Sequence, residues 1–148
     1  MANFVFNIAK GRVAYYATLP AASDALIVVP IETTGLEADD TLNNYDNLGA
    51  LLAGTNNEQT TMGRKTVSAS VTVTVDDTNN WVDVDMPDQT WTGATGNAIS
   101  ALLICYDADT GTGADTDIIP LTKHDFAVTP DGSDIVAQIA SSGFYRAA

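Results

Sequence analysis

The chain has 148 residues, 45% of them hydrophobic, which is typical of one ordinary domain with a real core rather than of a disordered tail. Nineteen acidic residues against six basic ones give a formal net charge of −13, and because so acidic a surface repels nucleic-acid phosphates, we expect no direct binding to DNA or RNA. No apolar stretch approaches the roughly 20 residues that cross a bilayer, and the first residues lack the basic and long apolar segments of a signal peptide, so we expect neither membrane insertion nor export. The single cysteine, Cys105, excludes an internal disulfide and lies in an apolar run typical of a buried, inert thiol.

The beginning of the chain contains two predicted β regions. Alternating apolar residues predict two short strands or one bent strand over residues 4–16. The apolar run 25–31 predicts a further strand. Because Pro30 has no N–H to donate to a ladder, we expect this strand to lie at a sheet edge or to end there.

One segment, residues 40–53, has the periodicity of a helix. Its apolar residues recur at spacings of three and four and would form one stripe: Leu42, Tyr45, Leu48, Leu51 and Leu52. Asp39 and Asp40 suit an N-cap and a first turn, whereas Gly49 inside the segment lowers helix propensity by about 1 kcal/mol. We expect one helix here.

The clearest strand pattern lies at residues 66–75, T-V-S-A-S-V-T-V-T-V. Side chains in a strand alternate between faces, so the valines and Ala69 would form an apolar face, and the serines and threonines a hydroxyl face. Turn residues follow at 76–80, and the alternation resumes at 81–86. We expect half-buried strands on both sides of this turn.

The rest of the chain consists of predicted strands separated by turn residues. The nearly continuous apolar run 98–106 predicts a central strand that is buried on both faces. Short strands are expected at 118–121, 126–128 and 135–139, and the turn at 129–132 should join the last two as a hairpin. Turn signals at about ten-residue intervals are typical of a β-sandwich or barrel.

These patterns predict a mainly β protein: an antiparallel β-sandwich or Greek-key-like single domain over residues 1–148, with one helix at about residues 40–53. No internal repeat or linker divides the sequence. We expect the core to include apolar residues from the predicted strands: Val67, Val71, Val73, Leu102, Ile104, Phe126, Val128, Ile135 and Ile139.

His124, the only histidine, is the natural candidate for a catalytic base. A serine-type triad needs a carboxylate that orients the base, but Asp125 is its neighbour in a predicted strand and would point to the opposite face. The sequence has no nucleophile elbow, P-loop or dinucleotide-binding fingerprint, and one cysteine with one histidine is too few for structural zinc. We predict that His124 is structural and that the protein is not an enzyme and needs no cofactor or small-molecule substrate.

The acidic loop 107–117, D-A-D-T-G-T-G-A-D-T-D, is the one weak candidate for a metal site. Carboxylates on a glycine-bearing loop suit Ca²⁺, and the candidate ligands are Asp107, Asp109, Asp115 and Asp117. The spacing departs from an EF-hand, since Gly111 stands at the third ligand position and no glutamate closes the loop. The alternative is a solvated loop whose aspartates cap turns, and we predict that calcium is not required.

The basic residues and the chain ends are the candidates for contacts with a partner. Basic pairs in an acidic protein suit ion pairing within the fold or with an oppositely charged partner, or they are scattered surface charge. The end of the chain combines two aromatic residues with an arginine, a composition enriched at interfaces. We expect contacts through a sheet edge and the chain ends; the alternative is that both ends are ordinary strands of their own domain. The candidate residues are Lys10, Arg12, Arg64, Lys65, Phe144, Tyr145 and Arg146.

Seven segments spread over nearly the whole chain carry a resemblance to known proteins. They are residues 6–11 (F-N-I-A-K-G), 34–39 (T-G-L-E-A-D), 51–58 (L-L-A-G-T-N-N-E), 85–91 (D-M-P-D-Q-T-W), 105–107 (C-Y-D), 120–134 (P-L-T-K-H-D-F-A-V-T-P-D-G-S-D) and 143–147 (G-F-Y-R-A). These segments resemble a family of small, mostly uncharacterised structural proteins of tailed bacteriophages, often encoded near the capsid genes. The resemblance implies a virion component and supplies no catalytic residue.

The resemblance favours a capsid decoration (cement) protein that binds the outer surface of the major capsid protein shell, and copies of itself are a further possible partner. Such a protein would be made in the host cytoplasm and located in the virion. One alternative is a tail, baseplate or fibre-associated module. Another is a host-surface carbohydrate-binding or hydrolytic domain, which would need an exposed aromatic platform or paired carboxylates in a cleft. Trp81 and Trp91 are more typical of core or sheet-face residues.

Overall fold

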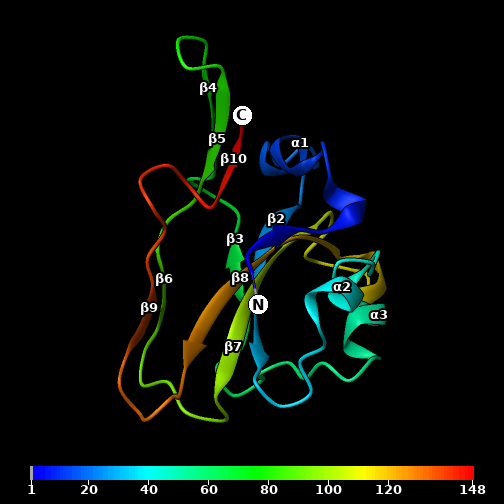
Figure 1. The fold of residues 1–148 in the computed structure, drawn as a ribbon, viewed down its shortest axis with the longest axis vertical. Coiled ribbons are helices and arrows are strands. Elements are labelled where there is room, and N and C mark those ends of the chain that lie inside the picture. The colour runs from blue at the N-terminus through cyan, green and yellow to red at the C-terminus, as the bar shows by residue number, and fades with distance from the viewer. Residues whose placement is uncertain (1) are drawn as a thin grey trace.

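A five-stranded antiparallel sheet lies at the centre of the computed structural model, which describes residues 2–148 (Figure 1). In spatial order its strands are β1 (Phe4–Val5), β8 (Ile119–Val128), β7 (Ile99–Asp107), β2 (Ala25–Glu32) and β3 (Lys65–Val67). β7 pairs with both β2 and β8, and its residues 101–106 are all buried. This confirms the predicted central strand that is buried on both faces.

Alternate side chains of β7 face two separate cores. Leu102 lies in a core shared with a two-stranded ribbon, formed by β6 (Gln89–Trp91) and β9 (Ile135–Ala137). Leu103 lies in the other core, beneath short helices. Figure 1 shows the ribbon and these helices on opposite sides of the sheet. The predicted class is confirmed: mainly β, with antiparallel sheets in a sandwich-like arrangement.

Two short helices replace the single helix expected at about residues 40–53. They are α2 (Asp39–Leu42) and α3 (Leu48–Leu52). Their fully buried residues all reach the same core: Leu42, Leu48 and Leu51. Between them, the run N-N-Y-D-N favours turns and caps over a helix interior, and the Asn47 side chain accepts a hydrogen bond from the Ala50 N–H (2.7 Å), as an N-cap does. The apolar spacing therefore identifies the buried face but not the break.

The N-terminal region is more helical than its alternation predicts. Within residues 4–16, the strand β1 is followed by a 3-10 turn, η1 (Asn7–Ala9), and then by α1 (Val13–Ala17). The expectation of a second or bent strand is wrong here. Val13 and Ala17 are four residues apart and bury one face of a helix, and so short an apolar pattern does not distinguish the helical period from the strand period.

The position of Pro30 follows from the pairing of β2. β3 pairs only with residues 26–28 of β2, and beyond them a loop lies on this side of the strand. There the Gln59 N–H donates to the Pro30 C=O (2.9 Å). The prediction that this strand lies at an edge or ends at the proline is therefore wrong: β2 lies between β7 and β3, Ile31 pairs with Glu58 in an isolated bridge, and the strand continues to Glu32. The proline is accommodated because its missing N–H would point toward this loop and not toward β7.

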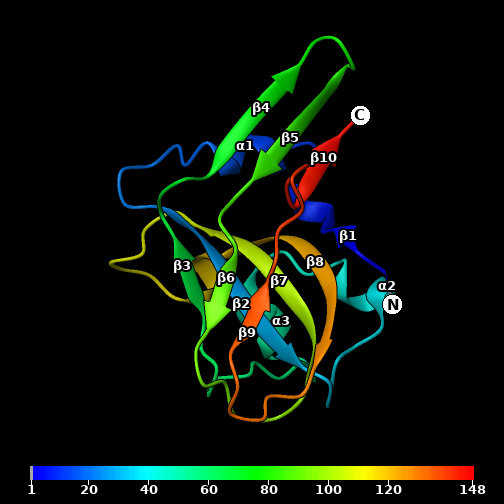
Figure 2. The same cartoon turned by 90° about the vertical axis from the view of Figure 1, so that its left-hand side faces the viewer.

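The continuous strand predicted over residues 66–75 is broken in the structure. Its first part, β3, ends at Val67 in the central sheet, Ser70 has a φ of 60°, and the second part belongs to another sheet. That sheet has the order β10-β5-β4 and consists of β4 (Thr72–Asp76), β5 (Trp81–Asp85) and β10 (Tyr145–Ala147). We call these three strands the arm and the remainder the body. Figures 1 and 2 show that the arm projects beyond the body.

The predicted core residues fall into three groups. Four are buried in the body: Val67, Leu102, Ile104 and Ile135. Four more pack against the same core while partly exposed: Val71, Phe126, Val128 and Ile139. Val73 lies in the arm and is only half-buried. The predicted C-terminal hairpin is wrong, since β8 is one long strand and β9 pairs with β6 instead.

Candidate functional site

The arm is an antiparallel sheet whose strands come from the middle and the end of the chain (Figure 2). The turn between β4 and β5 is the predicted D-D-T-N-N segment. The Asp76 carboxylate accepts hydrogen bonds from the N–H groups of Thr78 (2.9 Å) and Asn79 (3.0 Å), and Asn80 has a φ of 59°. Hydrogen bonds to its carboxylate, the side chain of Asn79 first, lower the pKa of Asp76. Local turn chemistry, rather than burial, therefore shapes this hairpin.

The strand register divides the arm into a valine face and an acidic face. Val73 is opposite Val84 and Val75 is opposite Val82, which places these four side chains on one face. The other face carries Thr72, Thr74, Asp76, Trp81, Asp83, Asp85 and Arg146. Within these three strands, all of which the structure describes, Val84 is the one fully buried side chain, whereas Val75 is 63% exposed. The arm therefore contributes mostly surface, with Tyr145 of β10 packed against the body core.

Arg146, a predicted contact residue, is held within the arm. Its guanidinium donates two hydrogen bonds to the Asp83 carboxylate (2.5 and 2.8 Å), and its Cζ lies 3.9 Å from the centre of the Trp81 ring. The hydrogen bond from Arg146 lowers the pKa of Asp83. Arg146 stacks on the half-buried Trp81, and Trp91 is only 2% exposed, so Trp91 offers no platform for a sugar ring.

Gly143 and Phe144 attach the C-terminal strand to the arm. The Phe144 N–H donates to the Val84 C=O (2.9 Å). Gly143 has a φ of 79°, and a Cβ at this position would lie 2.0 Å from the Val84 carbonyl oxygen, so both its backbone conformation and its close approach require glycine. Phe144 and Tyr145 are half-buried. The C-terminal end thus completes its own domain, which is the alternative considered for it from the sequence.

Arg64 and Lys65, two further predicted contact residues, are used inside the body. The Arg64 guanidinium forms bidentate pairs with Glu58 (2.6 and 2.8 Å) and with Asp115 (2.6 and 2.9 Å), and so ties the acidic loop to the rest of the body. The Lys65 ammonium lies 5.5 Å from the centre of the buried Trp91 ring. Both residues contribute to intramolecular contacts, which leaves less of them available to a partner.

Lys10 and Arg12 differ from the other predicted contact residues. Both are exposed, and the salt bridges found within residues 2–148 include neither. The Lys10 ammonium donates to the Asn7 side chain (2.6 Å). Both residues directly precede α1, which packs against β4 and β5 at the base of the arm. They supply exposed positive charge next to the helix that contacts the arm.

A fully buried lysine, Lys123, ties the N-terminal segment to the body. Its ammonium contacts the carboxylates of Asp39 (3.2 Å) and Asp125, and the main-chain carbonyl of Ala2 (3.2 Å). The Ala2 N–H also donates to the Asp39 carboxylate (2.7 Å). A single lysine in a strand carries no sequence signal of burial, because the partner that stabilises it from α2 is distant in the chain. The N-terminal end, like the C-terminal end, is part of its own domain.

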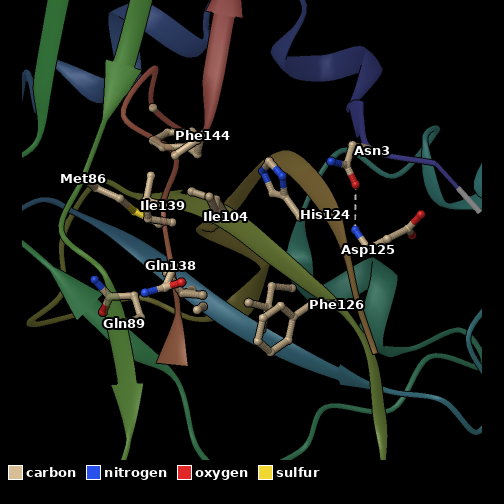
Figure 3. Close-up of a pocket in the computed structure, with 15 residues that line it drawn as sticks. Asn3, Met86, Gln89, Ile104, His124, Asp125, Phe126, Gln138, Ile139 and Phe144 are labelled. Carbon is tan, nitrogen blue, oxygen red and sulfur yellow. Dashed lines mark hydrogen bonds between the residues drawn. The ribbon is translucent and has the colours of Figure 1, made fainter. Parts of the chain in front are cut away.

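His124 lines a pocket of about 350 Å³ between β8 and the C-terminal segment (Figure 3). His124 Nε2 lies 2.9 Å from Thr122 Oγ1, and burial together with the nearby positive charge of Lys123 lowers the pKa of His124. The Asp125 N–H donates to the Asn3 side chain (2.7 Å), and the Asp125 carboxylate pairs with Lys123. Asp125 therefore does not orient His124, as its place in the strand predicts. The apolar walls include Met86, Ile104, Phe126, Ile139 and Phe144.

The four calcium candidates in the acidic loop do not converge on one point. Each carboxylate has a separate partner: Asp107 the N–H of Asp109, Asp109 the N–H of Gly111, Asp115 the guanidinium of Arg64, and Asp117 the N–H of Ala114. In the described part of the chain, no group of three or more His, Cys, Asp or Glu side chains is placed to hold a metal ion. These aspartates cap turns or pair with arginine.

Comparisons of the chain with protein-family models, with curated proteins and with solved structures found no match. Residues 2–148 contain no helix that is long and apolar enough to cross a membrane, and their longest α-helices have five residues. Function is therefore inferred from the geometry of the arm and the body, together with the resemblance of the sequence segments.

Proposed function

We propose that this chain is a structural protein of a tailed-bacteriophage virion, a decoration protein that binds the outer surface of a capsid shell through its arm. The arm is the structural observation that supports the proposal. Its three strands are maintained by a tight turn, by Arg146 and by Gly143, and they bury one side chain fully. A sheet built outside the core adds contact surface rather than stability, and its edges can pair with another chain.

The charge of the chain supports the same class of protein. A net charge of −13 favours solubility at the high copy number of a decoration protein and disfavours capture by nucleic acid. Arg64, Lys123 and Arg146 pair with carboxylates of the same chain, and Lys65 lies half-buried beside Trp91, so Lys10 and Arg12 are the exposed basic residues without a carboxylate partner among the described residues. The arm and this basic pair together would meet the major capsid protein.

We propose a non-catalytic role. His124 contacts the Thr122 hydroxyl rather than a carboxylate, Trp91 is buried, and Arg146 stacks on Trp81. A carbohydrate-binding domain would need an exposed aromatic platform, and a hydrolytic domain would need paired carboxylates in a cleft.

The first test is the copy number of this chain in purified virions. A decoration protein is expected in numbers comparable to those of the major capsid protein. A copy number comparable to that of tail or baseplate subunits would contradict the head location and favour a tail module.

The second test uses purified capsid shells that lack this chain. The wild type should decorate them, and a variant without residues 144–148, which form the end of the arm, should lose occupancy while its body still unfolds cooperatively. The control is Val136→Thr. Val136 is exposed on β9, which pairs with β6 of the body and not with a strand of the arm. A folded truncation that fills every site would contradict the role of the arm.

A further inference from the structure

The outer edge of β4 offers free backbone hydrogen-bonding groups. The Val84 C=O accepts a hydrogen bond from Phe144, so the backbone groups of Val84 point away from β4. Val73, directly opposite Val84, is therefore in a non-hydrogen-bonded pair, and its own N–H and C=O point outward. By alternation the backbone of Val75 also points outward, and that of Thr74 points inward to β5. The end of the strand order at β4 leaves these outward groups without a strand neighbour among the described residues.

This edge lacks the features with which proteins usually protect an edge strand. β4, T-V-T-V-D, has no lysine, proline or register shift over its five residues. The other edge strands of the described sheets are shorter. β1 has two residues, and the remaining four have three each: β3, which contains Lys65, β10, which contains Arg146, and β6 and β9 of the two-stranded ribbon. The structure thus presents one long, unprotected edge, on the element that stands outside the body (Figure 2).

The charge of the arm selects the kind of strand that fits. Its acidic face carries three carboxylates, those of Asp76, Asp83 and Asp85, and Arg146 pairs with Asp83. A strand added beside β4 would place alternate side chains on this acidic face and the others beside the valine face. Charge complementarity therefore favours lysine or arginine at alternate positions, with small apolar residues between them. A second copy of β4 would bring the same acids together, in a chain whose net charge is already −13.

We propose that β4 recruits an extended segment of a capsid protein as an additional strand, with alternating basic and apolar side chains, bonded to the backbone of Val73 and Val75. The identification of the segment as part of a capsid protein rests on the proposed function. The free edge of β4 and its preference for basic side chains are independent of that function. The added strand would extend the arm from three strands to four, and its basic side chains would lie beside Asp76 of β4, with Asp83 and Asp85 on the next strand of the same face.

The test compares two substitutions at one position. Val73→Pro removes the outward N–H and leaves the hydrogen bonds between β4 and β5 in place, and a preceding extended residue accommodates proline. Val73→Ala removes more side chain but keeps the N–H, so it is the matched control. On capsid shells that lack this chain, Val73→Pro should weaken binding by about tenfold or more, whereas Val73→Ala should bind nearly as well as the wild type. Thermal melts of both variants establish that each is folded.

A second probe is independent of the shell. A synthetic peptide that alternates lysine and valine should shift the amide NMR signals of Val73 and Val75 and slow their hydrogen exchange, and a peptide that alternates glutamate and valine should not. If wild-type protein decorates shells and Val73→Pro decorates them equally well, the proposed function stands and the β4 inference is overturned. If the wild type does not decorate shells, the proposed function is contradicted. The peptide experiment then decides the β4 inference alone: binding of the lysine–valine peptide supports an added strand at β4, and absence of binding contradicts it. Self-association that Val73→Pro abolishes would overturn the choice of occupant.

Discussion

The body and the arm are both antiparallel sheets, but they are stabilised in different ways. In the body, β7 buries residues 101–106 between two cores, and burial of apolar surface contributes about 25 cal/mol per Å². In the arm, one side chain is fully buried, and the contacts are a turn, an exposed ion pair and a close backbone approach at Gly143. Exposed ion pairs contribute only about 0–1 kcal/mol each. The apolar sequence of β7, I-S-A-L-L-I-C-Y-D, thus serves a strand that stabilises the fold, whereas the alternating T-V-T-V-D of β4 serves a strand whose side chains are mostly exposed.

This difference predicts that the arm opens before the body unfolds. Segments with few buried apolar contacts open locally at lower free energy than the global transition. Substitutions in the body should therefore change the midpoint of global unfolding, and substitutions in the arm should change local exchange.

Leu103→Ala should destabilise the whole protein by about 2–5 kcal/mol, because it empties space beneath α2 and α3 at a side chain with no exposed surface. Chemical denaturation measures the change in the free energy of unfolding. The control is Val136→Ala, at an exposed position of the body, which should change it by less than about 0.5 kcal/mol. Equal effects from the two variants would contradict the assignment of the core.

Gly143→Ala should detach β10 from the arm. The new Cβ would lie 2.0 Å from the Val84 carbonyl oxygen, in addition to the backbone strain of about 1–3 kcal/mol at a positive φ. The loss is limited by the free energy that holds β10, since the strand can separate and leave the body folded. The measurement is hydrogen exchange at Tyr145 and Ala147, which should accelerate.

Gly132→Ala is the matched control for this clash. Gly132 also has a positive φ, 93°, but a Cβ there would meet nothing within 4 Å, so the variant adds strain without collision. It should leave exchange in β10 unchanged. If both variants accelerate exchange in β10 equally, the close approach to Val84 is not what fixes the strand.

Arg64→Gln should destabilise the body by about 1–2 kcal/mol at neutral pH. This loss lies between those expected for an exposed ion pair and for a buried charge-assisted hydrogen bond, because Arg64 and its two partners are partly buried. The hydrogen bond from Arg64 lowers the pKa of Asp115 below its ordinary value of 3.8. The folded state therefore binds fewer protons than the unfolded state in this range, so the contribution of the pair is present above about pH 4 and is lost as the pH falls through the folded-state pKa. Thermal melts of wild type and variant should converge in acid; a constant difference would show that the charge of Asp115 is not involved.

The sequence predicts the body better than the arm, for a physical reason. A strand that is buried on both faces has a continuous apolar sequence, as in residues 98–106, and few other elements share this pattern. In the helical region, the spacing of the leucines identifies the face that packs on the sheet, even though the N-N-Y-D-N run divides the helix. Alternation of apolar and polar residues predicts a strand with two different faces but does not indicate which sheet the strand joins. The strand predicted at residues 66–75 therefore passes from body to arm, through Ser70, without any change in pattern.

The predicted contact residues show the same limit. Composition identifies arginines and aromatic residues as candidates, but whether a charge is free depends on partners that are distant in the chain. Arg64 pairs with Asp115 and Arg146 with Asp83, 51 and 63 positions away. The burial of Lys123 beside Asp39, 84 positions away, depends equally on the fold and has no local signal.

Val75→Thr should have the smallest effect, below about 0.5 kcal/mol, although it replaces an apolar residue in the middle of the clearest strand pattern of the chain. Val75 is 63% exposed, so the substitution removes little buried apolar surface, and threonine is β-branched and retains the preference for a strand. The free energy of unfolding should therefore match that of the wild type within error. Leu103→Val is the corresponding conservative change in the body and should still produce a measurable loss, because a fully buried side chain loses volume. If Val75→Thr destabilised the protein as much as Leu103→Val, the valine face of the arm would have to be part of a core in solution, and the division between a body that provides stability and an arm that provides surface would no longer hold.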